Sequence, residues 1–264
     1  MTVDDASLAY QGVADAWAAG AAPLYDRLAV LLVDQLPGPL SGSAVLDIGA
    51  GTGAVSRALV QRGAVPFAVD SAPDMIDRCR TAGLHGVVAD MLALPFGNGA
   101  YDHAVAAFSV SHVDDPVRAV SEARRVVRPA GTVVAGVFAA AAPNRSKRAI
   151  DAVAEEFGYV PPPWYLHFKR DLEPLTNTAP AFRDVARRAG LADVSTQELT
   201  VETGVNASAD IVGSRLGMAH MAPWVASLAP ARRSALVEAA VNAVARDPEP
   251  LRPTVVVMSG RVGA

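Results

Sequence analysis

The chain has 264 residues, of which 51% are hydrophobic and 19% are charged, and its formal net charge is −4. That length is ample for the core of one large domain, and the slight acidic excess argues against a nucleic-acid partner. The longest stretches without a formal charge, residues 129–144 and 216–231, contain proline and fall short of the roughly 18 apolar residues of a spanning helix. No membrane span is therefore expected.

The sequence also bears on compartment and metal content. It opens with Asp4 and Asp5, where a secretory signal would be basic, and its one cysteine, Cys79, allows no internal disulfide. Both features predict a cytoplasmic protein. No cluster of His or carboxylate residues has the spacing of a metal site, so no metal is expected.

Short β-branched runs alternate with longer amphipathic stretches through the first half of the chain. After one or two helices over 10–36, strands are predicted at 44–48, 65–70, 86–89, 102–108 and 131–138, and helices at about 52–62, 73–83 and 116–128. Strands that are apolar on both faces and separated by helices are typical of a parallel sheet. The predicted fold class is α/β, with a Rossmann-like doubly wound sheet.

The second half of the chain is less regular. Residues 142–171 are interrupted by three consecutive prolines. A helix is then predicted at about 180–189, a strand at 192–202, helices at about 208–228 and 230–246, and a last strand at 254–260. No clear linker is present, so a single domain is predicted over 1–264. It would comprise an N-terminal helical cap (1–40), a cofactor-binding core (41–138), and a substrate lid with the rest of the sheet (139–264).

The sharpest local signal is the segment V-L-D-I-G-A-G-T-G at residues 45–53. Glycines directly after a first strand let the backbone turn tightly and let a ligand approach closely, although the turn alone could require them. Gly49 and Gly51, followed by Ala54, fit the relaxed dinucleotide pattern. Asp47 favours another cofactor. A carboxylate here would repel a diphosphate but attract the ammonium and sulfonium groups of S-adenosylmethionine.

Further acids follow the next two predicted strands. Asp70 ends the second strand, where it is placed to accept hydrogen bonds from both ribose hydroxyls of a nucleoside. Asp90 ends the third strand and is followed by Met91, so its carboxylate can accept the adenine amino group beside apolar side chains. Ser71 and Met75 complete the predicted cofactor-binding set. The alternatives are capping of turns and helices for the acids and Ser71, and core packing for Met75.

Together these motifs resemble class I S-adenosylmethionine-dependent methyltransferases, and most closely their ubiquinone/menaquinone methyltransferase-like (type 11) group. The residues that carry the likeness are 47–53, 70–75, 89–91, 94–96, 101–102, 111–116 and 128–131. The resemblance implies a seven-stranded sheet whose last strand, 254–260, is antiparallel and inserts beside the fifth. It also implies that Tyr10 and Tyr25 cover the cofactor from N-terminal helices. Ala107 and Phe108 would contact its methionine part.

The chemistry of methyl transfer points to one candidate catalytic residue. The reaction is a displacement at an activated carbon, so much of catalysis can be positioning. An acceptor hydroxyl or acidic C–H must also lose a proton. His112 is the candidate base, because it follows the fourth strand at the edge of the sheet where ligands of this fold bind. A histidine packed beneath the cofactor loop is the alternative.

The acceptor is predicted to be a small hydrophobic molecule, such as a polyketide, an isoprenoid, a quinone-like compound or an aromatic metabolite. The prediction rests on the apolar, aromatic composition of 142–178 and 204–250, which would form a helical lid. Candidate acceptor contacts are Trp164, Tyr165, His167, His220 and Trp224. An ordinary surface loop for His167 and core packing for His220 are the alternatives.

The sequence therefore predicts an enzyme, with S-adenosylmethionine as cofactor and a small-molecule acceptor as its partner; a homodimer is a further expectation. Two other classes stay open. One is a methyltransferase-fold protein that binds the cofactor but catalyses a step other than methylation, or only binds. The less favoured one is an NAD(P)-dependent oxidoreductase, against which Asp47 argues.

Overall fold

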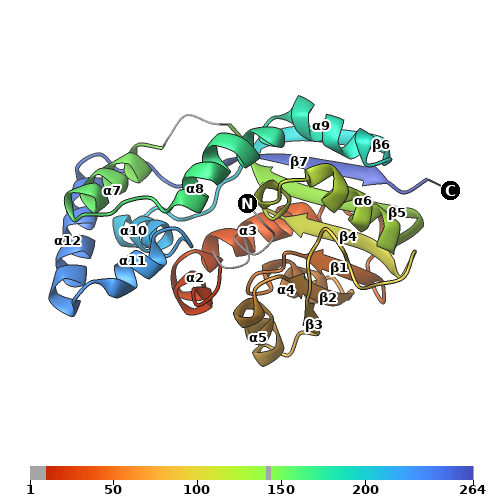
Figure 1. Cartoon of the computed structure of the whole chain (residues 1–264), viewed down its shortest axis with the longest axis horizontal. Helices are drawn as coiled ribbons and strands as arrows, with labels where there is room; N and C mark the ends of the chain where they lie inside the picture. Colours follow the sequence, from red (N-terminus) through yellow and green to blue (C-terminus); the bar gives the residue numbers. More distant parts are fainter. Residues whose placement is uncertain (1–9, 141–143, 264) are drawn as a thin grey trace.

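The computed structural model of the protein describes residues 10–140 and 144–263. Seven strands form one sheet in the order β3-β2-β1-β4-β5-β7-β6 (Figure 1). β7 pairs antiparallel with both β5 and β6, and the other neighbouring strands pair parallel. The strands are β1 (Ala44–Ile48), β2 (Val65–Asp70), β3 (Gly86–Val88), β4 (Tyr101–Ala107), β5 (Val127–Phe138), β6 (Ala192–Thr200) and β7 (Thr254–Arg261). This confirms the predicted sheet, including the antiparallel last strand beside the fifth.

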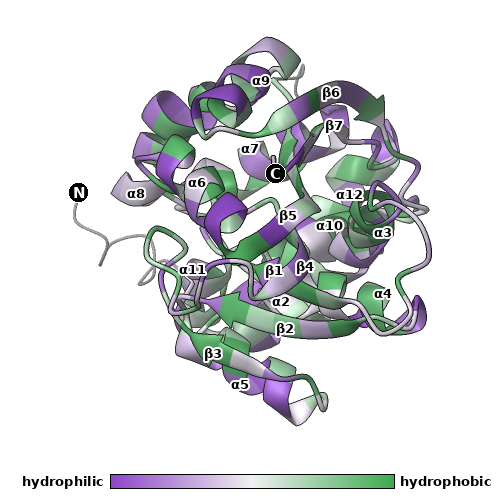
Figure 2. Ribbon diagram, turned by 90° about the vertical axis from the view of Figure 1, so that its right-hand side faces the viewer, coloured by the Kyte–Doolittle hydropathy of each residue, from purple (hydrophilic) through white to green (hydrophobic). Residues whose placement is uncertain are grey.

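Helices cover both faces of the sheet. The core helices are α2 (Ala14–Gly20), α3 (Ala22–Val33), α4 (Ala54–Gln61), α5 (Pro73–Thr81), α6 (Pro116–Val126) and α9 (Ala179–Arg188). The apolar side chains of α3 and α4 pack on one face, and those of α6 and α9 pack on the other. In Figure 2 the ribbon of β2 is largely hydrophobic, whereas α9 alternates between hydrophobic and hydrophilic residues, as an amphipathic helix does.

A helical lobe lies to one side of the sheet (Figure 1). It contains α7 (Arg145–Glu156), α8 (Pro163–His167), a π-helical turn (Phe168–Leu172), α10 (Ser208–Leu216), α11 (Ala222–Ser227) and α12 (Pro230–Arg246). Its own core includes Ile150 of α7, Ile211 of α10 and Leu236 of α12, all fully buried. Neither α7 nor α8 was predicted as a helix from the sequence.

Two predicted boundaries are wrong. The helix predicted over 116–128 ends at Val126, and β5 begins at once at Val127, which pairs with Tyr101 of β4. The early part of β5 is irregular, with a φ of 64° at Ala130, so the alternation expected of a strand is lost there. As a result, Arg128 lies in β5 and its Nε pairs with Asp102 at 2.9 Å.

The helix predicted over 208–228 is in fact two helices. α10 ends before Gly217, and α11 begins with Pro223 in its first turn, where proline is well tolerated. Gly217 lies in close contact with α2, since a Cβ there would lie 3.0 Å from Ala16 O. The break therefore occurs where the lobe packs against the N-terminal helix.

Within the part of the chain that the structure describes, no single helix combines the length and apolarity needed to cross a bilayer. The helices α2 and α3 meet that criterion only when joined, and a bend of 78° separates them. Six residues of α3, including Leu28 and Leu32, are buried in the protein core.

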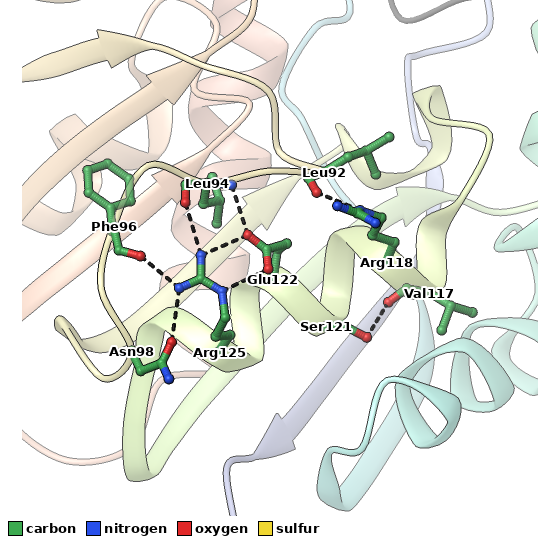
Figure 3. A network of polar contacts seen from close by, with 9 residues as sticks. All are labelled: Leu92, Leu94, Phe96, Asn98, Val117, Arg118, Ser121, Glu122 and Arg125. Carbon is green, nitrogen blue, oxygen red and sulfur yellow. Dashed lines mark hydrogen bonds and ion pairs between the residues drawn. The ribbon is translucent and has the colours of Figure 1, made fainter.

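Arg125 of α6 fixes the loop between β3 and β4 (Figure 3). Its guanidinium donates to the carbonyl oxygens of Leu94 (2.9 Å) and Phe96 (2.7 Å). It also donates to Asn98 Oδ1 at 3.1 Å and pairs with Glu122 at 2.8 Å. The hydrogen bond from Arg125 is the main reason that the pKa of Glu122 lies below its ordinary value.

Replacing Arg125 by Met should lower the free energy of unfolding by about 1–3 kcal/mol, because the loop carbonyl oxygens and Glu122 lose charge-assisted hydrogen bonds. Urea unfolding followed by circular dichroism measures the change. Ser121→Ala is a matched control on the same helix. Its hydroxyl only donates to Val117 O one turn back, so we expect a change within about 0.5 kcal/mol. Equal losses in the two variants would contradict this role for Arg125.

Candidate functional site

The turn after β1 is built from glycines in the left-handed region. Gly49 and Gly51 have φ values of 68° and 53°, and the amides of Gly49 and Ala50 donate to Val69 O at 2.8 and 2.9 Å. A Cβ on Gly49 would lie 2.2 Å from the Cβ of Ser109, whereas a Cβ on Gly51 would meet no atom within 4 Å. Gly49 is therefore required for packing, and Gly51 leaves open space at the carboxyl ends of the strands.

A cavity at this edge of the sheet brings the predicted cofactor residues together. Its lining includes the whole predicted set: Tyr10, Tyr25, Asp47, Gly49, Gly51, Asp70, Ser71, Met75, Asp90, Met91, Ala107 and Phe108. The candidate base His112 lines it as well. Ligands of open α/β sheets bind at such an edge, outside the carboxyl ends of the strands.

Asp47 is fully buried beside the glycine turn. Its Oδ2 accepts hydrogen bonds from the backbone N–H of Ser56 (2.9 Å) and from the Ser56 hydroxyl (2.7 Å). Its Oδ1 is buried and has no hydrogen-bond partner in the described part of the protein. Burial raises the pKa of Asp47 to about 7, against the lowering effect of the two Ser56 bonds. A buried acid with one free oxygen at a cavity is suited to bind a cation.

Asp70, the last residue of β2, connects the glycine turn to α5. Its Oδ2 accepts from Gly51 N at 2.8 Å, and its Oδ1 accepts from Ala72 N at 2.9 Å. Burial raises its pKa, and these two bonds oppose that effect. Asp70, not Ser71, makes the side-chain bond at the start of α5, while Ser71 is exposed on the cavity wall. Each oxygen of Asp70 retains a lone pair for a further hydrogen bond.

Asp90 and Met91 lie where the chain leaves β3. Asp90 Oδ1 accepts from Leu92 N at 2.8 Å, which closes a local turn. Met75 is 2% exposed and packs with Val13. Met75 thus belongs both to the core and to the cavity wall, so core packing and a contact with a cofactor are compatible roles for it.

Aromatic side chains from the N-terminal helices cover the cavity. The ring centroids of Trp17 and Tyr25 lie 4.7 Å apart, and Tyr25 meets Phe108 edge-on at 5.5 Å. Phe108 has a φ of 59°, an uncommon conformation for an aromatic residue, and this directs the chain away from β4. Burial raises the pKa values of Tyr10 and Tyr25, so both phenols are neutral near pH 7.

His112 ends a short 3-10 turn (Val110–His112) beside the cavity. Its ring stacks on Phe168 with centroids 4.3 Å apart and planes at 4°, and the Tyr10 ring meets it edge-on at 5.5 Å. The Tyr10 hydroxyl lies 3.3 Å from His112 Nε2. Burial lowers the pKa of His112 to about 4, so the ring is neutral near pH 7 and offers one donor and one acceptor nitrogen.

The five predicted acceptor contacts are not among the residues that line the cavity, but some touch its cover. Trp164 packs against Tyr10, with centroids 6.2 Å apart. Tyr165 stacks on His220 at 3.8 Å with nearly parallel planes. This pair connects α8 with the segment between α10 and α11.

The remaining two lie on either side of that pair. His167 Nδ1 bonds Asp171 at 2.6 Å, and its Nε2 lies 3.7 Å from Asp114, a cavity residue. Trp224 packs on Tyr159, with centroids 5.1 Å apart, inside the helical lobe. Over residues 10–140 and 144–263, no group of three or more His, Cys, Asp or Glu residues is arranged to hold a metal ion.

Trp17, Ser109 and Leu172 also line the cavity, although they were not predicted as site residues. Ser109 Oγ donates to Ile48 O at 2.8 Å and so ties the loop after β4 to the glycine turn. Leu172 reaches the cavity from the π-helical turn. No local pattern distinguishes these residues from core positions, because their role depends on contacts with distant parts of the chain.

Comparisons with known proteins point to a methyltransferase domain. Residues 46–135 match a family model described as a methyltransferase domain. Demethylmenaquinone methyltransferase of Renibacterium salmoninarum is 30% identical over 137 residues, which are 51% of this chain and 56% of that protein. The chain thus spans about half the length of the curated relatives it matches.

Two solved structures share the fold. Phosphoethanolamine N-methyltransferase 2 of Haemonchus contortus, in complex with phosphomonomethylethanolamine and S-adenosylhomocysteine, aligns with a TM-score of 0.56 and 16% identity over 90% of this chain and 52% of that chain. The 4+2 cyclase SpnF aligns with a TM-score of 0.58 and 19% identity, covering 90% and 82%.

The fold defines a Rossmann-like domain, and its strand-end cavity, lined by three acids, is suited to a nucleoside cofactor. More specifically, residues 46–135 are similar to a methyltransferase domain, and the matched half of the chain resembles S-adenosylmethionine-dependent methyltransferases.

Asp47→Asn tests the buried acid. Folded Asp47 keeps its proton up to about pH 7, whereas the unfolded residue releases it near about pH 4. The folded state binds more protons between these values, so this residue makes stability fall as pH rises through the window. Asparagine stays neutral. When pH is raised from about 4 to 8, the free energy of unfolding should fall in both proteins. We expect the fall to be about 2–4 kcal/mol smaller in the variant than in the wild type, as measured by urea unfolding.

The control for that comparison is Asp77→Asn, whose carboxylate on α5 is 71% exposed. It should follow the pH dependence of the wild type. If the free energy of unfolding changed with pH equally in the wild type and in Asp47→Asn, burial would not raise the pKa of Asp47 and the interpretation would be wrong.

Proposed function

We propose that this protein transfers the methyl group of S-adenosylmethionine to a small hydrophobic acceptor. The observation that carries the proposal is Asp47, whose buried Oδ1 has no hydrogen-bond partner among the described residues and which lines a cavity together with Asp70 and Asp90. The three acids lie at or just beyond the carboxyl ends of three adjacent strands, β1, β2 and β3. They match the polar groups of this cofactor, which are a cationic methionine end, two ribose hydroxyls and an adenine amino group.

The residues present fit the cofactor. Asp47 would hold its cationic end, Asp70 its ribose and Asp90 its adenine, while the open space over Gly51 lets it approach the backbone. When bound, the cofactor supplies a methyl group already activated by a positively charged sulfur. The chain itself supplies alignment and the exclusion of water, and the aromatic cover of Trp17 and Tyr25 is suited to both tasks.

His112 would contact the acceptor next to the site of transfer. Its ring is held by the stack on Phe168 and by the Tyr10 hydroxyl, so it has little freedom to rotate. A neutral imidazole can hold an acceptor hydroxyl or carbonyl oxygen by a hydrogen bond, and it can receive a proton as the new bond forms. The apolar, aromatic surroundings support a hydrophobic acceptor.

The direct test is the formation of S-adenosylhomocysteine. The full chain is incubated with S-adenosylmethionine and pools of apolar hydroxyl-bearing, quinol-type and polyketide-type acceptors, and products are followed by mass spectrometry. A product heavier by one methylene group supports methyl transfer. Tight cofactor binding without product from any pool would favour a methyltransferase-fold protein that catalyses another step. Selective binding of a nicotinamide dinucleotide would refute the proposal.

Asp70→Ala should weaken binding of S-adenosylhomocysteine by about 1.5–3 kcal/mol, or roughly tenfold to a hundredfold. The variant loses the charged acceptor for the ribose hydroxyls. Isothermal titration calorimetry measures the dissociation constant. Asp77→Ala, on the exposed side of α5, serves as the control and should bind as the wild type does. Unchanged affinity in Asp70→Ala would refute the ribose assignment.

His112→Gln should lower kcat by about tenfold to a thousandfold, while the affinity for S-adenosylhomocysteine stays unchanged. Because the pKa of His112 is lowered to about 4, its ionisation should not shape the pH profile of the wild type between about pH 6 and 9. His85→Gln, an exposed position, is the control. A wild-type titration near pH 6.5 that disappears in His112→Gln would contradict the neutral ring.

A further inference from the structure

A second polar cluster lies in the helical lobe, where α7 and α10 meet. The Arg215 guanidinium binds Asp151 in a bidentate pair, with Nε–Oδ1 at 2.8 Å and Nη2–Oδ2 at 2.9 Å. The Arg215 side chain is only 11% exposed. Burial acts to lower the pKa of Arg215. The hydrogen bonds that Arg215 donates to Asp151 outweigh this effect and keep the pKa above its ordinary value, and Tyr165 acts in the same direction. Arg215 and Asp151 thus form a fixed, neutralised pair.

Lys147 adds an uncompensated charge to this cluster. It lies one turn before Asp151 on α7, so the two side chains share a face of the helix. In the described part of the protein no carboxylate forms an ion pair with Lys147, because Asp151 is bound to Arg215 and Glu173 is paired with Lys169. Desolvation of the amine by the surrounding protein lowers the pKa of Lys147 to about 8, and the positive charges of Arg215 and Lys169 lower it further. The Lys147 side chain nevertheless remains accessible to solvent, so a ligand can reach it.

His220 lies at the same cluster. It is 8% exposed, and its buried Nε2 has no hydrogen-bond partner among the described residues. Burial, and then the charges of Arg215, Lys147 and Lys169, lower the pKa of His220 to about 2. The ring is therefore neutral, and its buried, unpartnered nitrogen can form one hydrogen bond with a ligand that enters the cluster.

Tyr165 joins this cluster to the cofactor cavity. Its ring stacks on His220, and its hydroxyl acts on the pKa of Arg215. On the cavity side, the Tyr165 ring meets Trp164 edge-on with centroids 5.8 Å apart, and Trp164 packs against Tyr10 at 6.2 Å. Tyr10 and Tyr25 both line the cavity. Tyr165 consequently lies between the aromatic cover of the cavity and the cationic cluster of the lobe.

We propose that the acceptor carries one anionic group, such as a carboxylate, which Lys147 and His220 bind while its apolar rings extend along Tyr165 toward the cofactor cavity. The proposal rests on the proposed function, because it specifies the acceptor of the same site. A single negative charge is favoured because Lys147 is the one cation of the cluster without an anionic partner in the described chain. A dianion would leave one charge uncompensated next to Asp151 and Glu173.

Anilinonaphthalene sulfonate, an apolar ring system with one negative charge, serves as the probe, and neutral phenylnaphthylamine serves as its uncharged counterpart. Fluorescence titration of the full chain, with and without S-adenosylhomocysteine, gives both dissociation constants. Lys147→Met should weaken binding of the sulfonate by about tenfold to a hundredfold and leave that of the neutral probe unchanged. Lys147→Arg, which keeps the positive charge, should bind the sulfonate about as tightly as the wild type does. Arg148→Met, at the next exposed position of α7, is the matched control and should change neither.

A second readout is pH. Sulfonate binding to the wild type should weaken as pH rises through about 8, because Lys147 then loses its proton, whereas Lys147→Arg should show no such loss. Equal sulfonate affinity in wild type and Lys147→Met would overturn the proposal, and so would equal losses for both probes. Calorimetry with S-adenosylhomocysteine shows whether each variant folds, and Lys147→Gln replaces Lys147→Met if that variant does not. A chain that binds the sulfonate as expected but no S-adenosylhomocysteine would refute the proposed function and leave the anion site standing.

Discussion

The burial of one carboxylate organises the whole cofactor end of this structure. Asp47 has no solvent exposure, and an isolated charge in such a place is strongly unfavourable. Ser56, in the first turn of α4, compensates one oxygen with two hydrogen bonds, so the strand end and the helix start are fixed together. The chain between them must then turn within a few residues, which requires the left-handed glycines. The second oxygen has no partner in the part of the chain that the structure describes, and the proposed contact with a cationic cofactor rests on it.

The parts of the molecule that follow from local chemistry could be predicted from the sequence. The strands β1 and β2 match their predicted bounds, because strands buried on both faces leave an uninterrupted apolar run. The acids that end these strands lie in one cavity, since the carboxyl ends of parallel strands share an edge of the sheet. The antiparallel insertion of β7 does not follow from such patterns. It was implied by the family resemblance alone, and the structure confirms it.

The features that could not be predicted depend on contacts between distant residues. Arg128 continues an amphipathic pattern, yet backbone pairing with β4 begins at Val127 and ends the helix first. Arg215 and Asp151 are separated by 64 positions, and nothing near either residue marks the other as its partner. The same holds for the stack of Tyr165 on His220, which forms only once α8 and the turn after α10 are packed in the lobe. Such contacts give no periodic signal in the sequence.

The site therefore has opposite charge preferences at its two ends. Among the described residues, an unpartnered oxygen of Asp47 lies at the strand edge and the unpaired ammonium group of Lys147 lies in the lobe, with Tyr165 between them. An acceptor held through an anionic group at Lys147 cannot reverse its orientation, because its charge would then lie near Asp47. The end of the acceptor that faces the cofactor must be the apolar or hydroxyl-bearing one. The atom that receives the methyl group would consequently lie far from the anionic group, and the product would keep the charge by which the substrate is recognised.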